Sequence, residues 1–340
     1  MRGYRRGRLA AALPCIRELS IYDDRRPRHR RRVRVLRDGF LDGTNLRVLR
    51  ATGLPRYDLL YLARDAAARS LVSLDVSGCD GLTDGVLERL AANLPALRRL
   101  RFRSCANVTS RGFLGALRAP FLEELDASRN RLSRPLPADA RLEVPAALRS
   151  LRLRACHLNV DLTVAVLVLC APALRTTDLS ECHPPSTRLI EAACAAGSGL
   201  RKLGLACWHE LRDFSFLARV PRLKMLDLAG CWGFDAARAE RLHHLPELRT
   251  LDLSCCTVSD DTKRRALLAL RTSGASIVVT EKTADCGAAV LGRLVGSSPS
   301  MDYRKQTLPV GAIVEGTFHW RDGKALLRIE CATRHLNGLS

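Results

Sequence analysis

The chain has no long apolar run. Its longest stretch without a charged residue, Leu162 to Leu174, is shorter than the roughly 20 apolar residues of a membrane-spanning helix. The arginine-rich first residues also lack the apolar core of a secretory signal. These absences exclude an integral membrane protein, and we expect an intracellular protein that contacts no membrane.

The motifs of catalysis are also missing. The sequence contains no nucleotide-binding glycine loop, no G-x-S-x-G, no H-E-x-x-H and no kinase signature. Its histidines are scattered over expected loops and helices, and no Ser/His/Asp set stands out. We therefore expect no enzymatic activity, no small-molecule substrate and no cofactor.

Lysine is scarce although the chain is strongly basic. The 340 residues carry 55 Lys and Arg against 35 Asp and Glu, a net charge of +20, and almost all of the basic residues are arginines. Half of the excess lies in residues 1–37. Codon usage in a GC-rich genome and selection for a cationic surface both explain this bias. In either case, such a surface attracts polyanions.

A repeated pattern, L-x-x-L-x-L-x-x-C, runs through most of the chain. We number each copy from its first leucine, at position 0, so that the other leucines occupy positions 3 and 5 and the cysteine position 8. Several copies are degenerate, but the spacing stays between 23 and 26 residues. The copies begin at Leu46, Leu71, Leu97, Leu122, Leu148, Leu174, Leu200, Leu223 and Leu248.

Each copy predicts a strand followed by a helix. The alternation at positions 3 and 5 indicates a short strand with inward leucines. A segment such as Asp84 to Leu94 indicates a returning helix, with Thr83 as its N-cap and Pro95 as its stop. One unit cannot bury its own apolar face, so the units must stack. We predict an α/β solenoid of about nine repeats, with a concave parallel sheet and convex helices.

The best repeats resemble a known family. They are LVSLDVSGCDGLTDGVLERLAANLP at 71–95, LRRLRFRSCANVTSRGFLGAL at 97–117 and LRTLDLSCCTVSDDTKRRALLAL at 248–270. These resemble the cysteine-containing leucine-rich repeats of F-box/leucine-rich-repeat proteins, and the resemblance covers about 46–280. It implies a leucine-rich-repeat horseshoe that recognises other proteins. No F-box-like helical module precedes Leu46, which argues against a ubiquitin-ligase role.

Six of the thirteen cysteines share position 8. Because cysteine packs well as a small apolar side chain, we predict a column of buried, reduced thiols. The alternative is a metal site built from the Cys and His residues between 170 and 209, but these contain no C-x-x-C pair. We expect no metal. The predicted thiol column consists of Cys79, Cys105, Cys156, Cys182, Cys231 and Cys256.

Position 4 is predicted to project from the concave face. Its charges alternate in sign through the first six repeats, from Arg50 to Asp178. Since neighbouring strands lie about 4.8 Å apart, we expect exposed ion pairs between neighbours in this column. Extra arginines in two repeats make the face mixed in charge, which favours a protein partner over RNA. The candidate protein-binding residues are Arg99, Arg101, Arg103, Asp126, Arg152, Arg154, Asp178, Asp227 and Asp252.

Position 1 is more uniformly basic and predicts a cationic stripe along one rim. Simple solvation of these side chains is the alternative to RNA binding. Val72 and Glu123 interrupt the stripe, and Lys224 and Arg249 end it. The candidate RNA-contacting residues at this position are Arg47, Arg98, Arg149, Arg175 and Arg201.

An arginine cluster at 25–37 precedes the repeats. It is typical of an RNA-contacting arm, of part of a mitochondrial import signal, or of a solvated extension. The candidate RNA-contacting residues of this arm are Arg25, Arg26, Arg28, Arg30, Arg31, Arg32 and Arg34.

Two tryptophans follow cysteines in adjacent repeats. Trp208 and Trp232 are candidates for an exposed aromatic rim, which would be a binding hot spot. Packing of the loops against the solenoid is the alternative.

The spacing divides the chain into four regions. An Arg-rich N-terminal extension is predicted at 1–45 and the solenoid at 46–280, closed by a strand at Ser276 to Thr280. A linker follows at 281–302. A small C-terminal extension at 303–340 contains a β-hairpin with an Asp-Gly turn.

These features predict a binding scaffold. Our leading interpretation is a structural or assembly subunit of a ribonucleoprotein such as an organellar ribosome. Its partners would be other proteins of a large complex, with RNA bound through the arm and the position-1 rim. The alternative is a protein–protein interaction scaffold without RNA: a ubiquitin-ligase substrate receptor, a signalling adaptor, or a cytoskeletal or axonemal subunit. Mitochondrial and cytoplasmic locations both stay open.

Overall fold

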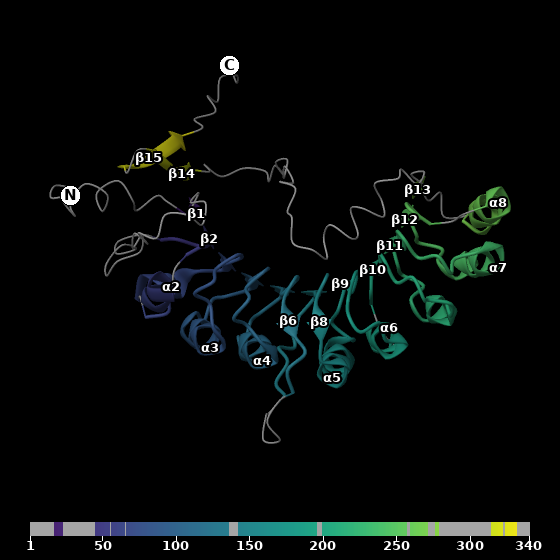
Figure 1. Ribbon diagram of the computed structural model, residues 1–340, viewed down its shortest axis with the longest axis horizontal. Helices are drawn as coiled ribbons and strands as arrows, with labels where there is room; N and C mark the ends of the chain where they lie inside the picture. The colour runs from purple at the N-terminus through teal and green to yellow at the C-terminus, as the bar shows by residue number, and fades with distance from the viewer. Residues whose placement is uncertain are drawn as a thin grey trace, which may run out of the picture.

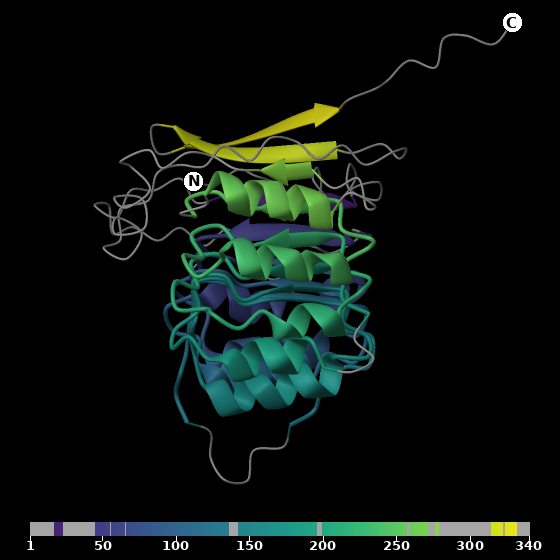
Figure 2. The ribbon, with the colours of Figure 1, turned by 90° about the vertical axis from the view of Figure 1, so that its right-hand side faces the viewer.

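The repeats stack into an arch. The computed structural model describes residues 17–22, 45–54, 56–64, 66–135, 142–195, 199–256, 259–270, 276–278, 314–321 and 324–331. Strands line the inner side of the arch and helices its outer side (Figure 1). Figure 2 views the arch from the end of its last described helix, so that successive repeats overlap. The predicted α/β solenoid with a concave parallel sheet and convex helices is confirmed.

One sheet of 13 strands forms the inner side, in the order β13-β12-β11-β10-β9-β7-β5-β4-β3-β2-β1-β14-β15. Neighbours pair in parallel, except that β14 and β15 form an antiparallel hairpin. The strands are β1 (Glu18–Tyr22), β2 (Val48–Thr52), β3 (Ser73–Asp75), β4 (Arg99–Arg101), β5 (Glu124–Asp126), β7 (Ser150–Arg152), β9 (Thr176–Asp178), β10 (Lys202–Gly204), β11 (Met225–Asp227), β12 (Thr250–Asp252), β13 (Ser276–Val278), β14 (Val314–Arg321) and β15 (Lys324–Cys331). A separate small sheet contains β6 (Arg131–Leu132) and β8 (His157–Leu158).

Helices return the chain along the outer side. Most of the described connections are α-helices, and three of them contain a short 3-10 helix, two of them beside an α-helix of the same repeat. The α-helices are α2 (Arg56–Leu62), α3 (Asp84–Asn93), α4 (Ser110–Leu117), α5 (Val160–Cys170), α6 (Thr187–Ala193), α7 (Ala236–Ala239) and α8 (Asp260–Ala269). The 3-10 helices are η1 (Ala66–Ser70), η2 (Ser215–Arg219) and η3 (Glu240–His244).

The sheet begins before the first predicted repeat. β1 pairs in parallel with β2 along its whole length, although it lies within the stretch that the sequence assigned to an extension. Its residues follow the same alternation, with Ile21 buried and Leu19 packed against the core. The shorter motif I-x-x-L-x-I starting at Ile16 lacks the position-8 cysteine. For that reason the pattern search missed it.

The leucines of the repeat form the core. At position 3, Leu74, Leu100 and Leu151 each have 0% exposure. Burying one such side chain stabilises the fold by about 1.5–3 kcal/mol. The buried face of α3 contains Val86, Leu87, Leu90 and Ala91, as helical spacing predicts.

The predicted cap of α3 works differently from expectation. Thr83 has the extended backbone of an N-cap residue, but its side chain makes no capping hydrogen bond. Instead, the carboxylate of Asp84 accepts hydrogen bonds from the backbone N–H and the hydroxyl of Thr109, at 2.7 and 2.6 Å. Thr109 is the N-cap residue of α4. The first turn of one helix is thereby joined to the start of the next.

A column of side chains at position 8, all buried except that Cys256 is partly exposed, links each repeat to the one before it. Each of these cysteines donates its thiol hydrogen to the backbone carbonyl at position 5 of the preceding repeat. For example, Cys79 reaches Ala51 at 3.2 Å and Cys182 reaches Leu153 at 3.1 Å. The same bond is made by Cys105, Cys156, Cys231 and Cys256. We call this set, with the two residues described next, the position-8 ladder.

Two other side chain types complete the position-8 ladder. Asn130 donates to the carbonyl of Phe102 at 2.8 Å. Trp208 donates its indole N–H to the carbonyl of Leu179, also at 2.8 Å, and is only 3% exposed. Both acceptors lie at position 5 of the preceding repeat. The ladder therefore requires a hydrogen-bond donor of suitable reach rather than a cysteine.

The residue before each ladder position has a left-handed backbone. Nine described residues have φ between 53° and 74°, and all of them occupy position 7. Three are glycines, and the others include Arg129 and Ala155. The backbone N–H at this position donates to the next repeat, as Gly78 does to Arg103 at 2.8 Å. The repeat geometry thus imposes a conformation that costs non-glycine residues about 1–2 kcal/mol.

Two glycine substitutions are expected to have opposite effects. A Cβ would meet nothing within 4 Å at either Gly78 or Gly85. Gly78→Ala places alanine at a φ of +67° and should lower the free energy of unfolding by about 1–2 kcal/mol. Gly85→Ala lies in α3 and should raise it by up to about 1 kcal/mol. Urea unfolding measures both, and shifts of the same sign would contradict the assignment.

The thiols of the position-8 ladder are expected to resist alkylation. Burial raises the pKa of Cys79 and of Cys156 to about 12 and that of Cys105 to about 11. Because only the thiolate reacts, iodoacetamide at about pH 8 should modify these cysteines only after unfolding. Partly exposed Cys207 and Cys255 serve as internal controls. Peptide mass spectrometry that finds equal labelling of both groups would contradict this prediction.

Candidate functional site

The position-4 column lies on the concave face as predicted. Strand pairing places Arg50 beside Asp75, Asp75 beside Arg101, and so on along the sheet to Asp252. The aspartates have a structural role there. Each accepts a hydrogen bond from the backbone N–H two residues later, as Asp75 does from Ser77 at 3.0 Å and Asp252 from Ser254 at 2.9 Å. Asp126, Asp178 and Asp227 do the same.

The expected ion pairs between position-4 neighbours do not form. Across the described strands, none joins two adjacent members of this column. The arginines at position 6 reach diagonally instead: Arg103 pairs with Asp126 at 2.5 Å, and Arg154 pairs with Glu181 at 2.6 Å. An arginine side chain is long enough to reach an acid of the next repeat. A contact in which two of its N–H groups donate is favoured over a contact through one. The prediction of neighbour pairs was therefore wrong.

Three concave arginines keep unpaired charges. Arg99, Arg101 and Arg152 are partly exposed, and each lacks a salt bridge in the part of the chain that the structure describes. We call them the concave arginines. They lie on β4 and β7, on either side of β5. The N-terminal half of the face thus carries three arginines whose charge no acid of the described chain neutralises.

Two aspartates of the concave face, the buried Asp126 and the half-buried Asp227, differ in their electrostatics. Burial pushes the pKa of Asp126 up, but the hydrogen bond and charge of Arg103 outweigh burial and hold the pKa below its usual value. Burial, together with the charge of Asp252, raises the pKa of Asp227. The negative charges of Asp227 and Asp252, which are neighbours at the C-terminal end of the face, therefore disfavour each other.

The position-1 column is continuous along one rim. Backbone hydrogen bonds join its members, as Arg98 N–H donates to Val72 and Val72 N–H donates to Arg47. Arg47 N–H in turn donates to Arg17 at 2.8 Å, which adds an exposed arginine that sequence analysis missed. The I-x-x-L-x-I motif of β1 was the signal that would have revealed it.

Members of the position-1 column differ in how they are satisfied. Arg98 pairs with Glu123 at 2.6 Å, and Lys224 lies 3.8 Å from Glu247. Arg175 donates to two carbonyls of its own repeat. Four exposed arginines make neither a salt bridge nor a side-chain hydrogen bond within the described ranges: Arg47, Arg149, Arg201 and Arg249. We call them the open rim arginines.

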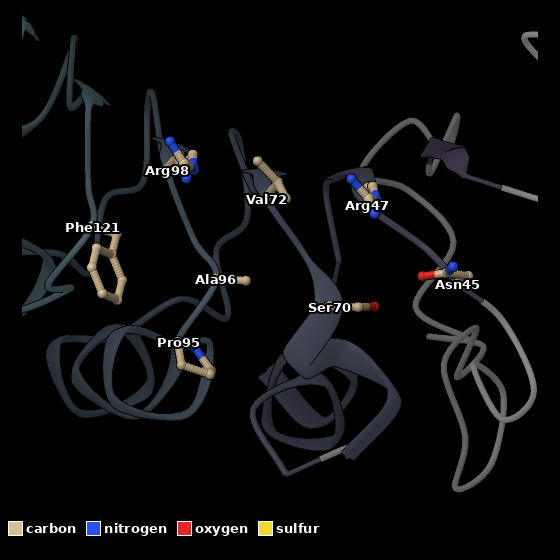
Figure 3. Close-up of a pocket in the computed structure, with 8 residues that line it drawn as sticks. All are labelled: Asn45, Arg47, Ser70, Val72, Pro95, Ala96, Arg98 and Phe121. Atoms are coloured by element: carbon tan, nitrogen blue, oxygen red, sulfur yellow. The ribbon is translucent and has the colours of Figure 1, made fainter. Parts of the chain in front are cut away.

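A pocket interrupts the rim near its N-terminal end. Its volume is about 650 Å³, and it is lined by Asn45, Arg47, Ser70, Val72, Pro95, Ala96, Arg98 and Phe121. Figure 3 shows Arg47, Val72 and Arg98 in a row, with Asn45 at one end and the ring of Phe121 at the other. Ser70, Val72 and Ala96, which have short side chains at positions −1 and 1 of adjacent repeats, lie between the longer side chains of Arg47, Arg98 and Phe121. We refer to it as the rim pocket.

The expected aromatic rim is only half correct. Trp208 is buried in the position-8 ladder, so the exposed-rim hypothesis is wrong for it and the alternative, packing against the solenoid, holds. Trp232 is 55% exposed, and its ring stacks on His209 with centroids 4.2 Å apart. Trp208 occupies position 8 of its repeat, whereas Trp232 occupies position 9.

Position 9 contains a series of rings that sequence analysis did not recognise. His157, His183, His209 and Trp232 occupy it in four successive repeats. His157 and His183 pair through their backbones, and their rings lie 5.8 Å apart edge to face. Listing histidines by repeat position, rather than along the chain, would have found this column.

Several predicted features lie outside the described residues. The arm arginines between Arg25 and Arg34, the linker at 281–302 and the Asp-Gly turn of the hairpin belong to this group. Among the residues that are described, no group of three or more His, Cys, Asp or Glu is arranged to hold a metal ion. The described helices also include none that is long and apolar enough to cross a membrane.

Comparisons with known proteins point to one family. A family model described as a leucine-rich repeat matches residues 244–261. No curated protein matches the chain. Similar solved structures include a Leptospira interrogans leucine-rich-repeat protein, with 17% identity and a TM-score of 0.43, and the yeast Rad7–Elc1 complex, with 16% identity and a TM-score of 0.49. A third is the TLR13–ssRNA13 complex, with 21% identity and a TM-score of 0.50.

These matches cover only parts of longer proteins. Alignments include 68%, 69% and 71% of this chain, but 54%, 62% and 34% of the Leptospira, Rad7–Elc1 and TLR13 chains. At such identities the likeness to TLR13 is one of fold. It fits the arch, the parallel sheet and the convex helices described above.

Two aspartate substitutions are expected to change stability in opposite directions at neutral pH. Asp126→Asn removes the charged acceptor of Arg103 and should cost about 1–3 kcal/mol. Asp227→Asn keeps an acceptor for the N–H of Ala229 but removes a disfavoured charge, and should raise stability by up to about 1 kcal/mol. Urea unfolding at several pH values measures both changes.

The pH dependence follows from the two pKa shifts. The contribution of Asp126 is present above its unfolded pKa of about 3.9 and is lost as pH falls through its lower folded pKa. The contribution of Asp227 is full below about 3.9 and is lost as pH rises through its higher folded pKa. Both differences from wild type should therefore shrink in acid. A gain from Asp227→Asn that persists at about pH 3 would contradict this explanation.

Proposed function

Because this chain is a leucine-rich-repeat protein, we propose that it is a non-catalytic binding scaffold that assembles into a ribonucleoprotein, such as an organellar ribosome. RNA is bound through the position-1 column. One observation carries this proposal: the open rim arginines Arg47, Arg149, Arg201 and Arg249 are exposed, aligned on one rim and not neutralised by the described part of the protein.

The physical basis is the energetics of phosphate binding. Each arginine that neutralises a phosphate releases counterions, so affinity increases with the number of contacts and falls with salt. Guanidinium groups also hydrogen-bond phosphate oxygens through two donors. The position-1 column carries a cation in every repeat except those with Val72 and Glu123, so it presents these groups repeatedly along an extended partner. The net charge of +20 adds long-range attraction.

The concave face is assigned to a protein partner within the same assembly. Its aspartates are used by the fold itself, whereas Arg99, Arg101 and Arg152 keep their charge available. A partner with an acidic surface fits this arrangement. The TLR13 structure contains an ssRNA, so in that protein the fold accommodates RNA.

The second candidate function is a protein–protein interaction scaffold without RNA. The concave arginines favour it, since an acidic protein surface satisfies them without any role for the rim. Ubiquitin-ligase substrate receptors, signalling adaptors and cytoskeletal or axonemal subunits belong to this class. Charge reversal of Arg101 and Arg152 would then abolish partner binding, while changes on the rim would have no effect.

The test compares two charge reversals in the full chain. Arg149→Glu with Arg201→Glu changes the rim, and Arg89→Glu with Arg118→Glu places the same charge change on exposed helix-side arginines. Fluorescence anisotropy with a single-stranded RNA oligonucleotide measures affinity over a salt series. The rim variant should weaken binding at least about tenfold and reduce the salt slope by roughly 1.4, about 0.7 per lost contact. The control variant should bind almost as wild type does.

Two outcomes would contradict the RNA proposal. One is the absence of RNA binding by the wild-type chain at physiological salt. The other is equal weakening by both charge reversals, which would indicate a response to net charge alone. In cells, sedimentation of the tagged protein with a large particle should collapse on RNase treatment, and an RNase-resistant complex would favour the second candidate.

A further inference from the structure

The rim pocket differs from the rest of the position-1 column in its chemistry. Elsewhere along the rim this position is mostly cationic, but here Val72 replaces an arginine between Arg47 and Arg98. Ala96 and Ser70 have short side chains, so the surface beside Val72 is recessed. The result is an apolar depression between two cations. Its volume of about 650 Å³ falls in the range of small-molecule sites, about 300–1,000 Å³.

An exposed aromatic ring forms one end of the depression. Phe121 is 59% exposed, although burial of a phenylalanine ordinarily stabilises a protein by about 1.5–3 kcal/mol. It immediately precedes the first leucine of its repeat, where the other repeats have residues such as Ala96, Ala147 and Gly199. The repeat geometry therefore does not require an aromatic residue here. Pro95 and Ala96 of the preceding repeat extend the apolar surface from the Phe121 ring toward Val72.

The two flanking cations are arranged for an anionic chain. Glu123 holds the guanidinium of Arg98 at 2.6 Å, while the Arg98 side chain stays 56% exposed. Arg47 is an open rim arginine, and its backbone is bonded to that of Arg17, the exposed cation of the next strand. Beyond the pocket Glu123 follows Arg98 in the column, and cations resume at Arg149 and Arg201. Phosphates on either side of a bound base would thus meet Arg47 on one side and Arg98 on the other.

From this geometry we infer that the rim pocket receives one unpaired base of a single-stranded RNA, stacked on Phe121, with the adjoining phosphates on Arg47 and Arg98. This inference rests on the proposed function and names the part of the RNA that the rim binds. Stacking on an aromatic ring accepts any base because each has a π-face. The pocket therefore selects single-stranded over paired RNA without reading its sequence.

The first test removes the ring. Phe121→Ala should weaken binding of a single-stranded RNA oligonucleotide by about 5- to 150-fold, the usual effect of losing one stacked base. The salt slope should stay the same because no phosphate contact is lost. Leu169→Ala is the matched control, since Leu169 is similarly exposed on α5, on the helix side of the arch. It should bind as wild type does.

The second test fills the pocket with a positive charge. Val72→Arg restores the residue type that most other repeats carry at this position, so folding should be preserved. Attraction of phosphates alone predicts tighter RNA binding, whereas a base-filled pocket predicts weaker binding. We expect weaker binding, and with an oligonucleotide whose bases are removed we expect the variant to bind more tightly than wild type.

The outcomes separate this inference from the proposed function. If Arg149→Glu with Arg201→Glu weakens binding but Phe121→Ala does not and Val72→Arg strengthens it, the pocket assignment is overturned and the rim function stands. If the wild-type chain binds no RNA, both fall. If a free nucleoside monophosphate competes at the same concentration as the oligonucleotide, the pocket is a mononucleotide site and the RNA assignment is overturned.

Discussion

The hydrogen bond from position 8 to the position-5 carbonyl of the preceding repeat holds the solenoid in register. Most strands have only three residues and make few hydrogen bonds to the neighbouring strand. Strand pairing alone therefore fixes the register between repeats only weakly. The buried donor adds a fixed point just beyond each strand, and the left-handed residue at position 7 turns the chain toward it. A thiol, an amide and an indole all serve, as Cys79, Asn130 and Trp208 show. Geometry at this position, rather than residue identity, is what the repeat preserves.

The register that the position-8 ladder sets between repeats also aligns the side chains on the surface into columns. Once position 8 is fixed, positions 1, 4 and 9 must also align from one repeat to the next. The fold then uses some of these columns itself: aspartates at position 4 bind the backbone two residues later, and position-6 arginines pair diagonally. Charges not used in this way, such as Arg101 and Arg149, are left at regular spacing. The two candidate binding surfaces therefore follow directly from the internal hydrogen bonds.

Periodicity explains what was predictable from sequence. A nearly constant spacing identified four features: the leucines at positions 3 and 5, the position-8 thiols, the concave column and the rim column. Two errors arose where a residue was interpreted from the residues next to it in the chain instead of from its position in the repeat. Trp208 was grouped with Trp232 because both follow a cysteine, and the histidines of position 9 were counted along the chain. The diagonal ion pairs depended on arginine length, which periodicity does not report.

Departures from the repeat indicate where a partner contributes to selection. A residue that fits the repeat is explained by folding, whereas Val72 and Phe121 contribute nothing that a neighbouring repeat needs. Val72 stands where most repeats have a cation, and Phe121 exposes a ring to water, which is unfavourable for a solvated rim alone. Together they form one depression between Arg47 and Arg98. Independent drift explains a single departure, but two that complete the same pocket from different repeats are best explained by a ligand with an apolar, planar part and flanking negative charge.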